Sequence, residues 1–233
     1  MRTLAIGDIH GGLRALIQLI ERAGVTEEDR LIFMGDLVDG WSESFEVIDY
    51  LIQFSKTHSC IFIKGNHDLY CEEWLRTETD NPEWMKHGGK ATKESYASKS
   101  EEVKKSHLKF YENMQYYVID KDNKLFVHAG FTSMHGPQAE HHSSNLIWDR
   151  TLLEMALALD KTIDKESIRY PKRLKLFSEI YIGHTPTPHY GKELPIHAGN
   201  LWDIDTGAAF KGRLTAIDIK TKEIWQSDPV YTL

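Results

Sequence analysis

Leu4-Ala5-Ile6-Gly7-Asp8-Ile9-His10 is a short apolar run that ends at a glycine and continues directly into polar residues. The same pattern recurs at four later points, which are Gly35-Asp36, Gly65-Asn66-His67-Asp68, His128-Ala129-Gly130 and Gly183-His184-Thr185. Short apolar runs bounded by glycine predict strands that are buried on both faces. Ligands of α/β folds bind beyond the carboxyl ends of such strands. We therefore expect the five polar clusters to converge on one rim of one sheet.

Helical periodicity fills the intervals between these runs. Apolar residues recur at helical spacing in 13–23, 47–52 and 152–157. Strand and helix alternate over the first 65 residues, which predicts βαβ units. Residues 214–219 and 223–226 flank a Lys-Thr-Lys turn and predict a closing hairpin. The pattern as a whole predicts a mixed, layered α/β fold, and two sheets packed face to face with helices outside is one arrangement it allows.

The length of 233 residues fits one globular domain, so we expect residues 1–233 to fold as a unit. Residues 70–115 differ from the rest because they are polar, helical in character and rich in aromatic side chains. This segment lies between two of the polar clusters. It is therefore either a cap beside the site or a surface insertion with no catalytic role, and its composition favours neither.

Composition and charge exclude several classes of protein. The net charge is −7 and the chain has no basic tract, which argues against nucleic-acid binding. Two cysteines, Cys60 and Cys71, are too few for a disulfide-stapled secreted fold. We find neither a signal-peptide pattern nor an apolar stretch long enough to span a bilayer. A cytoplasmic protein without a membrane partner is expected.

The residue types in the five clusters point to a metal site. Carboxylate, amide oxygen and imidazole together suit Mn²⁺, Fe or Zn²⁺ better than Ca²⁺. One metal needs only three or four protein ligands, so six candidates with one shared carboxylate fit two metals better. The candidate ligands are Asp8, His10, Asp36, Asn66, His128 and His184. Two divalent ions balanced by two aspartates leave a local charge of about +2, which attracts a phosphate.

Each candidate also has an ordinary structural interpretation. Gly-Asp is a common turn dipeptide, and Asn after Gly is common in left-handed turns. His128 and His184 taken singly are most simply core histidines bonded to the backbone. The conjunction of five similar clusters at predicted strand ends is what favours metal ligation.

Taken in order, the five motifs resemble those of the calcineurin-like metallophosphoesterase superfamily, and within it the phosphoprotein phosphatase branch. That branch includes serine/threonine phosphatases and symmetrical diadenosine tetraphosphatases. The resemblance runs from residue 7 to about residue 210. It implies a layered α/β/β/α sandwich with mixed sheets, a dimetal site at the carboxyl ends of strands, and a small helical cap formed by residues 70–115.

The resemblance also implies a division of the ligands between two metals. The first metal would be held by Asp8, His10 and Asp36. The second would be held by Asp36, Asn66, His128 and His184, so that Asp36 bridges the pair. A hydroxide between the metals would attack phosphorus in line, without a phosphoenzyme.

Two further residues receive catalytic roles from the resemblance. His67 would act as general acid and protonate the leaving oxygen. Asp39 would orient His67 and keep it protonated. A helix N-cap is the alternative interpretation of Asp39.

Arg150, in Leu146-Ile147-Trp148-Asp149-Arg150, resembles the Trp-x-Arg element of the family. Its guanidinium would bind phosphate oxygens, although an arginine at the start of a helix is also a common surface feature. Asp205-Thr206-Gly207 resembles a turn of the bacterial branch, and Trp84 with Gly88-Gly89 resembles an element of its cap.

The chain departs from the family pattern at Asp39-Gly40-Trp41, where Asp-Arg-Gly is usual. The missing arginine normally contacts substrate phosphate. We expect either that Arg150 acts alone, that Arg76 or Lys90 of the cap replaces the missing side chain, or that the substrate is a different phosphoester.

The remaining histidines and tryptophans receive no site role. We expect His58, His87, His107, His135, His189 and His197 to be solvated, and His141-His142 to lie in a surface loop. We expect Trp41, Trp148, Trp202 and Trp225 to serve packing.

We therefore expect a metal-dependent phosphatase that hydrolyses phosphomonoesters, in a phosphorylated protein or a small phosphoester. The alternatives are a dinucleoside polyphosphate hydrolase and an inactive binding module. Mn²⁺ is the first expectation for both ions, with Fe or Zn²⁺ as alternatives. Phospho-residue preference and oligomeric state are not readable from the sequence.

Overall fold

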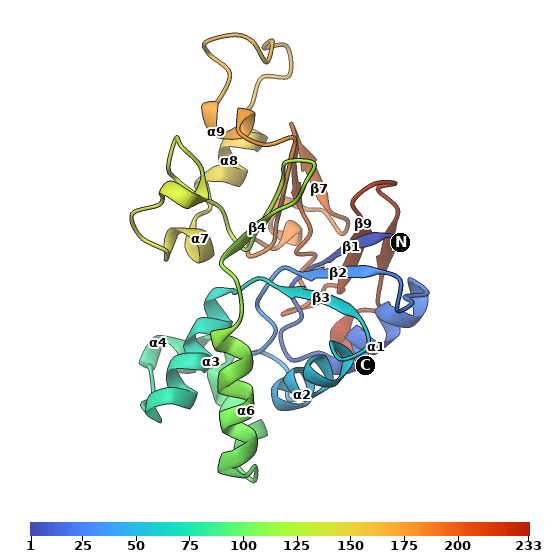
Figure 1. Ribbon diagram of the computed structural model, residues 1–233, viewed down its shortest axis with the longest axis vertical. Helices are drawn as coiled ribbons and strands as arrows, with labels where there is room; N and C mark the ends of the chain where they lie inside the picture. The colour runs from blue at the N-terminus through green and yellow to red at the C-terminus, as the bar shows by residue number, and fades with distance from the viewer.

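The computed structural model describes residues 1–233 and contains two five-stranded sheets (Figure 1). The first sheet has the order β10-β9-β1-β2-β3. Its strands are β1 (Thr3–Ile6), β2 (Arg30–Phe33), β3 (Ser59–Phe62), β9 (Thr215–Asp218) and β10 (Ile224–Gln226). β1, β2 and β3 are parallel, whereas β9 runs antiparallel to β1 and pairs with β10 as a hairpin. The closing hairpin predicted from the sequence is thereby confirmed.

The second sheet has the order β4-β5-β6-β8-β7. Its strands are β4 (Tyr117–Ile119), β5 (Lys124–Val127), β6 (Glu179–Ile182), β7 (Ile196–Ala198) and β8 (Leu201–Asp203). β5, β6 and β8 are parallel, and the two edge strands β4 and β7 are antiparallel to their neighbours. Both sheets are therefore mixed.

An apolar layer joins the two sheets. Ala5, Ile32 and Ile217 of the first sheet belong to one buried cluster with Phe126 and Tyr181 of the second. The rings of Phe126 and Tyr181 stack with centroids 5.0 Å apart. Because successive strand residues point to opposite faces, the neighbours of these residues are left to pack against helices outside.

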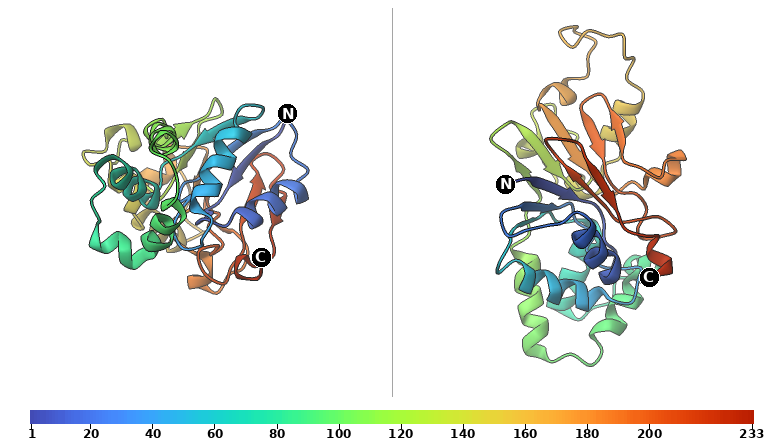
Figure 2. Two further views of the ribbon diagram at one scale, coloured as in Figure 1. Left: turned by 90° about the horizontal axis from the view of Figure 1, so that it is seen from below. Right: turned by 90° about the vertical axis from the view of Figure 1, so that its right-hand side faces the viewer.

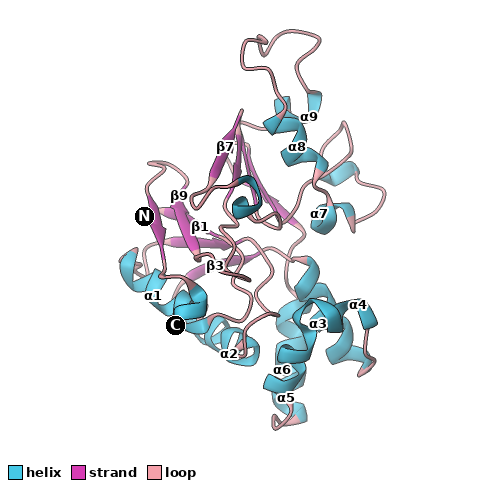
Figure 3. Cartoon of the chain, turned by 180° about the vertical axis from the view of Figure 1, so that it is seen from behind, coloured by secondary structure: helices cyan, strands magenta, loops and turns pink.

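Helices cover the outer face of each sheet (Figures 1 and 2). α1 (Leu13–Arg22) and α2 (Ser44–Phe54) pack on the first sheet and share its outer core. α8 (Thr151–Leu157) contacts β7 and β8 of the second sheet, with α7 (Asn145–Trp148) and α9 (Lys172–Lys175) on the same side (Figure 3). The layered α/β/β/α fold is confirmed, and so are the three predicted helices.

The expectation of one sheet was wrong. Of the five strands that precede polar clusters, β1, β2 and β3 belong to the first sheet, and β5 and β6 belong to the second. Apolar runs alone do not reveal which sheet a strand joins, because strand pairing depends on distant parts of the chain. The edge strand β3 is also only partly buried, contrary to the expectation of burial on both faces.

The segment 70–115 contains most of a helical group below the first sheet (Figures 1 and 3). Its elements are α3 (Asn66–Thr77), α4 (Pro82–Trp84), η1 (Met85–Gly89), α5 (Lys90–Tyr96) and α6 (Glu101–Glu112). Trp84, Tyr96 and Tyr111 are fully buried in the same apolar core as α1 and α2. None of the helices combines the length and the apolar character that a membrane span requires.

Candidate metal centre

The carboxyl ends of five strands place the polar clusters around one cavity. Asp8 and His10 follow β1, Asp36 follows β2, and Asn66 opens the helix after β3. His128 follows β5 and His184 follows β6. All six side chains are buried. The structure thus brings together every residue that was predicted to be a metal ligand.

Asp36 lies at the centre of this group. It forms one compact triad with Asp8 and His10, and a second with His128 and His184. Within each triad the donor atoms lie within 4.8 Å of one another. The side chain of Asp36 is therefore the one that two neighbouring ions could share.

Asn66 joins the second triad. Its Oδ1 lies 3.2 Å from Nε2 of His128, and Nε2 of His128 lies 3.3 Å from Oδ2 of Asp36. The three donor atoms therefore face a common space. Three donor side chains per metal, or four with Asn66, are typical of a catalytic site that leaves room for water or substrate.

Backbone carbonyls orient two of the imidazoles. Nδ1 of His128 lies 2.8 Å from the carbonyl oxygen of Met34, and Nδ1 of His10 lies 3.2 Å from that of Asp39. In the tautomer that donates from Nδ1, Nε2 keeps its lone pair and faces the other ligands. Such hydrogen bonds are the usual partners of metal-binding histidines.

Two buried donor atoms of the candidate ligands have no hydrogen-bond partner. They are Oδ1 of Asp8 and Nε2 of His184. A buried polar atom without a partner is costly, and buried polar groups are normally satisfied. Both atoms belong to the two triads, so a pair of divalent ions would satisfy them. The donor set present fits such ions.

The backbone at the site is held in uncommon conformations. His10, Asp36, Asp39 and His184 all have positive φ angles, between 51° and 74°. Left-handed backbone is rare for residues other than glycine and tends to cluster at functional sites. It turns each side chain sharply away from the end of its strand and toward the cavity.

Two glycines are required by close approach. A Cβ at Gly65 would collide with the carboxylate of Asp36, and a Cβ at Gly183 would collide with that of Asp8. The strand-ending glycines of the sequence pattern therefore make room for metal-ligand candidates that follow other strands, β2 in the same sheet for Gly65 and β1 in the other sheet for Gly183.

Asp68 holds the backbone around the ligands, a role that the sequence did not reveal. Its carboxylate accepts hydrogen bonds from the amides of Gly65 and Asp36 at 2.8 Å each, and from Leu37 at 3.0 Å. Asp68 therefore ties the end of β2 to the start of α3. Its position next to His67 was the only signal in the sequence.

Burial prepares the ligands for cations. Burial, together with neighbouring imidazoles, lowers the pKa of His10 to about 4 and that of His184 to about 3. Both rings are therefore neutral near pH 7 and can donate a lone pair. For Asp36, burial opposes ionisation, but His128 and His67 outweigh it and hold its pKa well below the usual range. The central carboxylate is thus charged.

His67 and Asp39 form a pair at the edge of the ligand group. Nδ1 of His67 lies 2.6 Å from Oδ2 of Asp39. Burial opposes a charged imidazole, but the carboxylates of Asp36 and Asp39 outweigh it and raise the pKa of His67 to about 9. The ring is protonated near neutral pH, as a general acid requires.

Asp39 is fully buried and receives further hydrogen bonds from the segment 70–115. Nε1 of Trp84 donates to Oδ2 at 2.6 Å, and the hydroxyl of Thr92 donates to Oδ1 at 2.5 Å. The residue that precedes α2 as its N-cap is Glu43, so the N-cap interpretation of Asp39 was wrong. Trp84 belongs to an element of the sequence that resembles the family's cap, whereas nothing in the sequence singled out Thr92.

Four of the six candidate ligands, His10, Asp36, Asn66 and His184, line a cavity of about 570 Å³, called here the metal-centre cavity. Arg150 is exposed and lines it, as do Trp148, Tyr70 and Asp205. Lys86 of the segment 70–115 also lies on its wall, paired with Glu83 at 2.8 Å.

The two cap residues suggested as replacements for the missing arginine were wrong. Arg76 is paired with Glu72 and Glu112, and Lys90 is paired with Glu94. Neither lines the metal-centre cavity. Besides the protonated ring of His67, the cationic side chains that line this cavity are Arg150 and Lys86, and Gly40 has no side chain to contribute.

Three other expectations need correction. His107 is not solvated: it is 1% exposed and stacks on Phe45 with ring centroids 4.7 Å apart. Trp148 is not a packing residue, because it is 45% exposed on the cavity wall. His87 and His189 are exposed as expected, but they line the metal-centre cavity.

Comparison with known proteins agrees with this geometry. A family model described as calcineurin-like phosphoesterase matches residues 1–206. The chain is 30% identical to the asymmetrical bis(5'-nucleosyl)-tetraphosphatase PrpE of Anoxybacillus flavithermus, over 91% of this chain and 88% of that protein. It is 27% identical to the protein of the same name in Oceanobacillus iheyensis, over 96% and 90% of the two chains.

Solved structures show the same fold at low sequence identity. A structure described as a putative diadenosine tetraphosphatase matches with a TM-score of 0.66 at 17% identity, over 97% of this chain and 92% of that one. A serine/threonine phosphatase of Saccharomyces cerevisiae with similarity to human PP5 matches with a TM-score of 0.65 at 14% identity, over 98% and 80%. Both likenesses concern the architecture alone.

Proposed function

The chain belongs to the calcineurin-like phosphoesterase family and is a metal-dependent hydrolase of phosphoric esters, and from this membership we propose that it cleaves dinucleoside polyphosphates at a dimetal centre. The observation that carries the proposal is the convergence of two buried triads on Asp36 at the floor of one cavity.

Asp8, His10 and Asp36 would hold one ion, and Asp36, Asn66, His128 and His184 the other. When bound there, two divalent ions supply an activated water and neutralise the charge that develops on phosphate oxygens. We propose Mn²⁺ as the metal, since carboxylate, amide and imidazole donors accept it and no thiolate is present.

His67 would donate a proton to the leaving oxygen, and Asp39 would hold its ring in place. The hydrogen bond from Nδ1 to Asp39 leaves Nε2 as the atom that can face the substrate. Trp84 donates to the same carboxylate oxygen as His67, and Thr92 donates to the other, so the orientation of the acid would depend on α4 and α5 as well as on α3. Arg150, exposed at the cavity wall, would bind phosphate oxygens bidentately.

Two observations support a dinucleoside polyphosphate as substrate. The relatives with identities of 27–30% that span most of this chain carry that activity in their names. In addition, Trp148 and Tyr70 present aromatic rings on the cavity wall, with centroids 6.0 Å apart. Exposed aromatic rings next to a phosphate site are suited to stack on nucleobases.

A phosphomonoester, in a phosphorylated protein or a small molecule, is the second candidate. The pair of His67 and Asp39 favours it. An alcohol is a poor leaving group that must be protonated, whereas a phosphate chain leaves readily as an anion. A general acid that is held firmly in place is therefore more useful for the hydrolysis of phosphate esters than for the cleavage of a phosphate chain.

A substrate panel separates the two. The protein loaded with Mn²⁺ is given diadenosine tetraphosphate, p-nitrophenyl phosphate and a phosphoserine peptide, and kcat/KM is measured for each. We expect the highest kcat/KM for diadenosine tetraphosphate. A higher value for the phosphopeptide would replace the first candidate with the second, and no activity on any substrate would reject both.

A further inference from the structure

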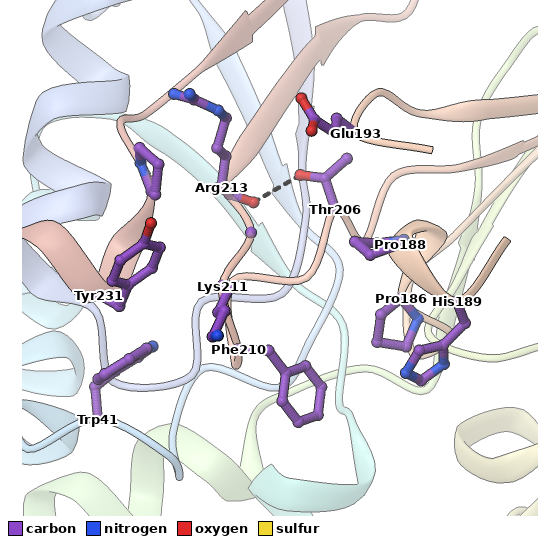
Figure 4. A pocket seen from close by; sticks show the side chains of 12 residues that line it. Trp41, Pro186, Pro188, His189, Glu193, Thr206, Phe210, Lys211, Arg213 and Tyr231 are labelled. Carbon is purple, nitrogen blue, oxygen red and sulfur yellow. Dashed lines mark hydrogen bonds between the residues drawn. The ribbon is translucent and has the colours of Figure 1, made fainter. Parts of the chain in front are cut away.

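A second cavity of about 860 Å³ adjoins the metal-centre cavity. The two cavities share the wall residues Pro186, His189 and Phe210. Beyond this boundary the second cavity is lined chiefly by Trp41, Lys211, Arg213 and Tyr231 (Figure 4). Its volume lies within the range of about 300–1,000 Å³ that is usual for small-molecule sites.

Aromatic side chains form much of its wall. Trp41 is held rigidly, because its indole N–H donates to the carbonyl oxygen of Ala208 at 2.7 Å. Phe210 is 59% exposed and Tyr231 is 54% exposed. Large aromatic side chains that remain exposed around one hollow indicate a binding surface. A fixed indole loses little entropy when a flat ring stacks on it.

Cationic side chains accompany these rings. In the view of Figure 4, Lys211 lies between the rings of Trp41 and Phe210. Arg213 also lines the cavity, but its guanidinium donates to the carbonyl oxygen of Ser227 at 2.9 Å and lies 3.9 Å from the carboxylate of Asp228. Glu193 is the one acidic side chain of the lining. The cavity therefore combines flat apolar faces with positive charge, although the whole chain is acidic.

We propose that the second cavity binds one nucleotide half of the substrate, with its base between the aromatic side chains and its phosphates directed toward the metal centre. This inference rests on the proposed function. A bare phosphate would gain nothing from three aromatic rings, and a purely apolar ligand would gain nothing from the ammonium group of Lys211. A nucleoside phosphate uses both, because bases stack on aromatic rings and phosphates pair with Lys and Arg.

The boundary between the cavities explains how one molecule would occupy both. Since His189 and Phe210 line both spaces, a phosphate chain that crosses between them links the metal ligands to the aromatic wall. A simple phosphomonoester would fill the metal-centre cavity alone. The two substrate types should therefore depend differently on the second cavity.

The test uses the double variant Lys211→Ala/Tyr231→Ala. Both side chains are exposed and neither belongs to the candidate metal centre. The matched control is Tyr190→Ala/Lys192→Ala, which removes an exposed tyrosine and an exposed lysine that line neither cavity. The Mn²⁺-loaded proteins are assayed with p-nitrophenyl phosphate as the substrate. In this assay, inhibition constants are measured for orthophosphate and for a methylene-bridged analogue of diadenosine tetraphosphate. Isothermal titration of the same analogue reports binding without turnover.

In the double variant we expect the inhibition constant and the Kd of the analogue to rise about tenfold, as the loss of one stacked base would cause. The inhibition constant of orthophosphate and the KM of p-nitrophenyl phosphate should remain within about twofold of wild type. The control variant should match wild type in every one of these constants. Equal analogue binding in the double variant and wild type would overturn the inference, and so would an equal loss for orthophosphate.

Failure of the proposed function gives a different result. If wild type does not hydrolyse diadenosine tetraphosphate but binds the analogue more tightly than the double variant, the substrate proposal fails and the nucleotide site stands. If wild type hydrolyses diadenosine tetraphosphate with the same KM as the double variant, the substrate proposal stands and the nucleotide site fails.

Discussion

Nδ1 of His67 lies 2.6 Å from Oδ2 of Asp39, and the same oxygen accepts a second hydrogen bond from Trp84, also at 2.6 Å. This oxygen of Asp39 therefore links His67, which follows the metal-ligand candidate Asn66, to the segment 70–115. A displacement of Asp39 would move the imidazole relative to the cavity. We therefore expect the reactivity of the centre to depend on Trp84 as well as on the candidate ligands.

Replacement of His67, the proposed general acid, should separate chemistry from metal binding. We expect His67→Asn to retain metal ions, because His67 is not a member of either triad. kcat should fall by about 100-fold or more on a phosphoserine peptide, whose alcohol must be protonated. The loss should be smaller on p-nitrophenyl phosphate, whose leaving group needs less help. Metal content is measured by mass spectrometry and kcat by steady-state kinetics; release of metal from the variant would show that the role is misassigned.

Asp39→Asn should change the pH dependence as well as the rate. The carboxylate of Asp39 favours the protonated form of His67, so its removal should lower the pKa of that imidazole. The alkaline limb of the kcat profile should therefore shift to lower pH, while the metal content is retained. A rate that falls equally at every pH would indicate that Asp39 only positions the ring.

Metal stoichiometry should depend unequally on the ligands. Asp36 belongs to both triads, whereas Asn66 adjoins only one. We expect Asp36→Asn to lose both ions and Asn66→Ala to retain about one, with Asp160→Asn, at an exposed carboxylate, as control. Addition of Mn²⁺ should raise the Tm of wild type, because a ligand that binds only the folded state stabilises it. Retention of both ions by Asp36→Asn would contradict a shared carboxylate.

The segment 70–115 should contribute to catalysis through Thr92. Its buried hydroxyl donates to Asp39 and has a further contact with Ser44 at 2.9 Å. We expect Thr92→Val to lower the free energy of unfolding by about 1–3 kcal/mol, because Oδ1 of Asp39 loses its partner. kcat should fall several-fold with metal content unchanged. Thr79→Val, an exposed site in the same segment, is the control; an unchanged kcat in Thr92→Val would favour a purely structural insertion.

His107 should make folding sensitive to mild acid. Burial lowers its pKa to about 4, against 6.5 when unfolded. Below pH 6.5 the unfolded chain therefore binds a proton that the folded protein does not, and this contribution to stability falls as pH falls toward 4. We expect His107→Gln, which can still pair with the hydroxyl of Tyr96, to remove this effect. Between pH 7 and 5, wild type should lose about 2 kcal/mol more than the variant in urea unfolding.

Much of the fold follows from local pattern. The apolar runs ending at Gly7, Gly35 and Gly65 are strands in the structure, and the helical spacing of 13–23 and 47–52 is the spacing of α1 and α2. These elements were predictable because a strand or a helix is encoded within a few residues by its periodicity. The division of the strands between two sheets was not predictable in this way, because strand pairing joins remote parts of the chain. In β1, for example, Leu4 pairs with Asp218 of β9.

The sequence by itself determined the chemistry of the candidate centre: which donor types are present, in what order, and next to which glycines. Only the tertiary structure decided how the donors are shared and supported. It placed Asp36 in both triads, set Thr92 against Asp39, and built the second cavity from segments as distant as Trp41 and Tyr231. The physical reason is that ligand type is a property of one side chain, whereas sharing, burial and cavity shape arise only when remote segments pack together.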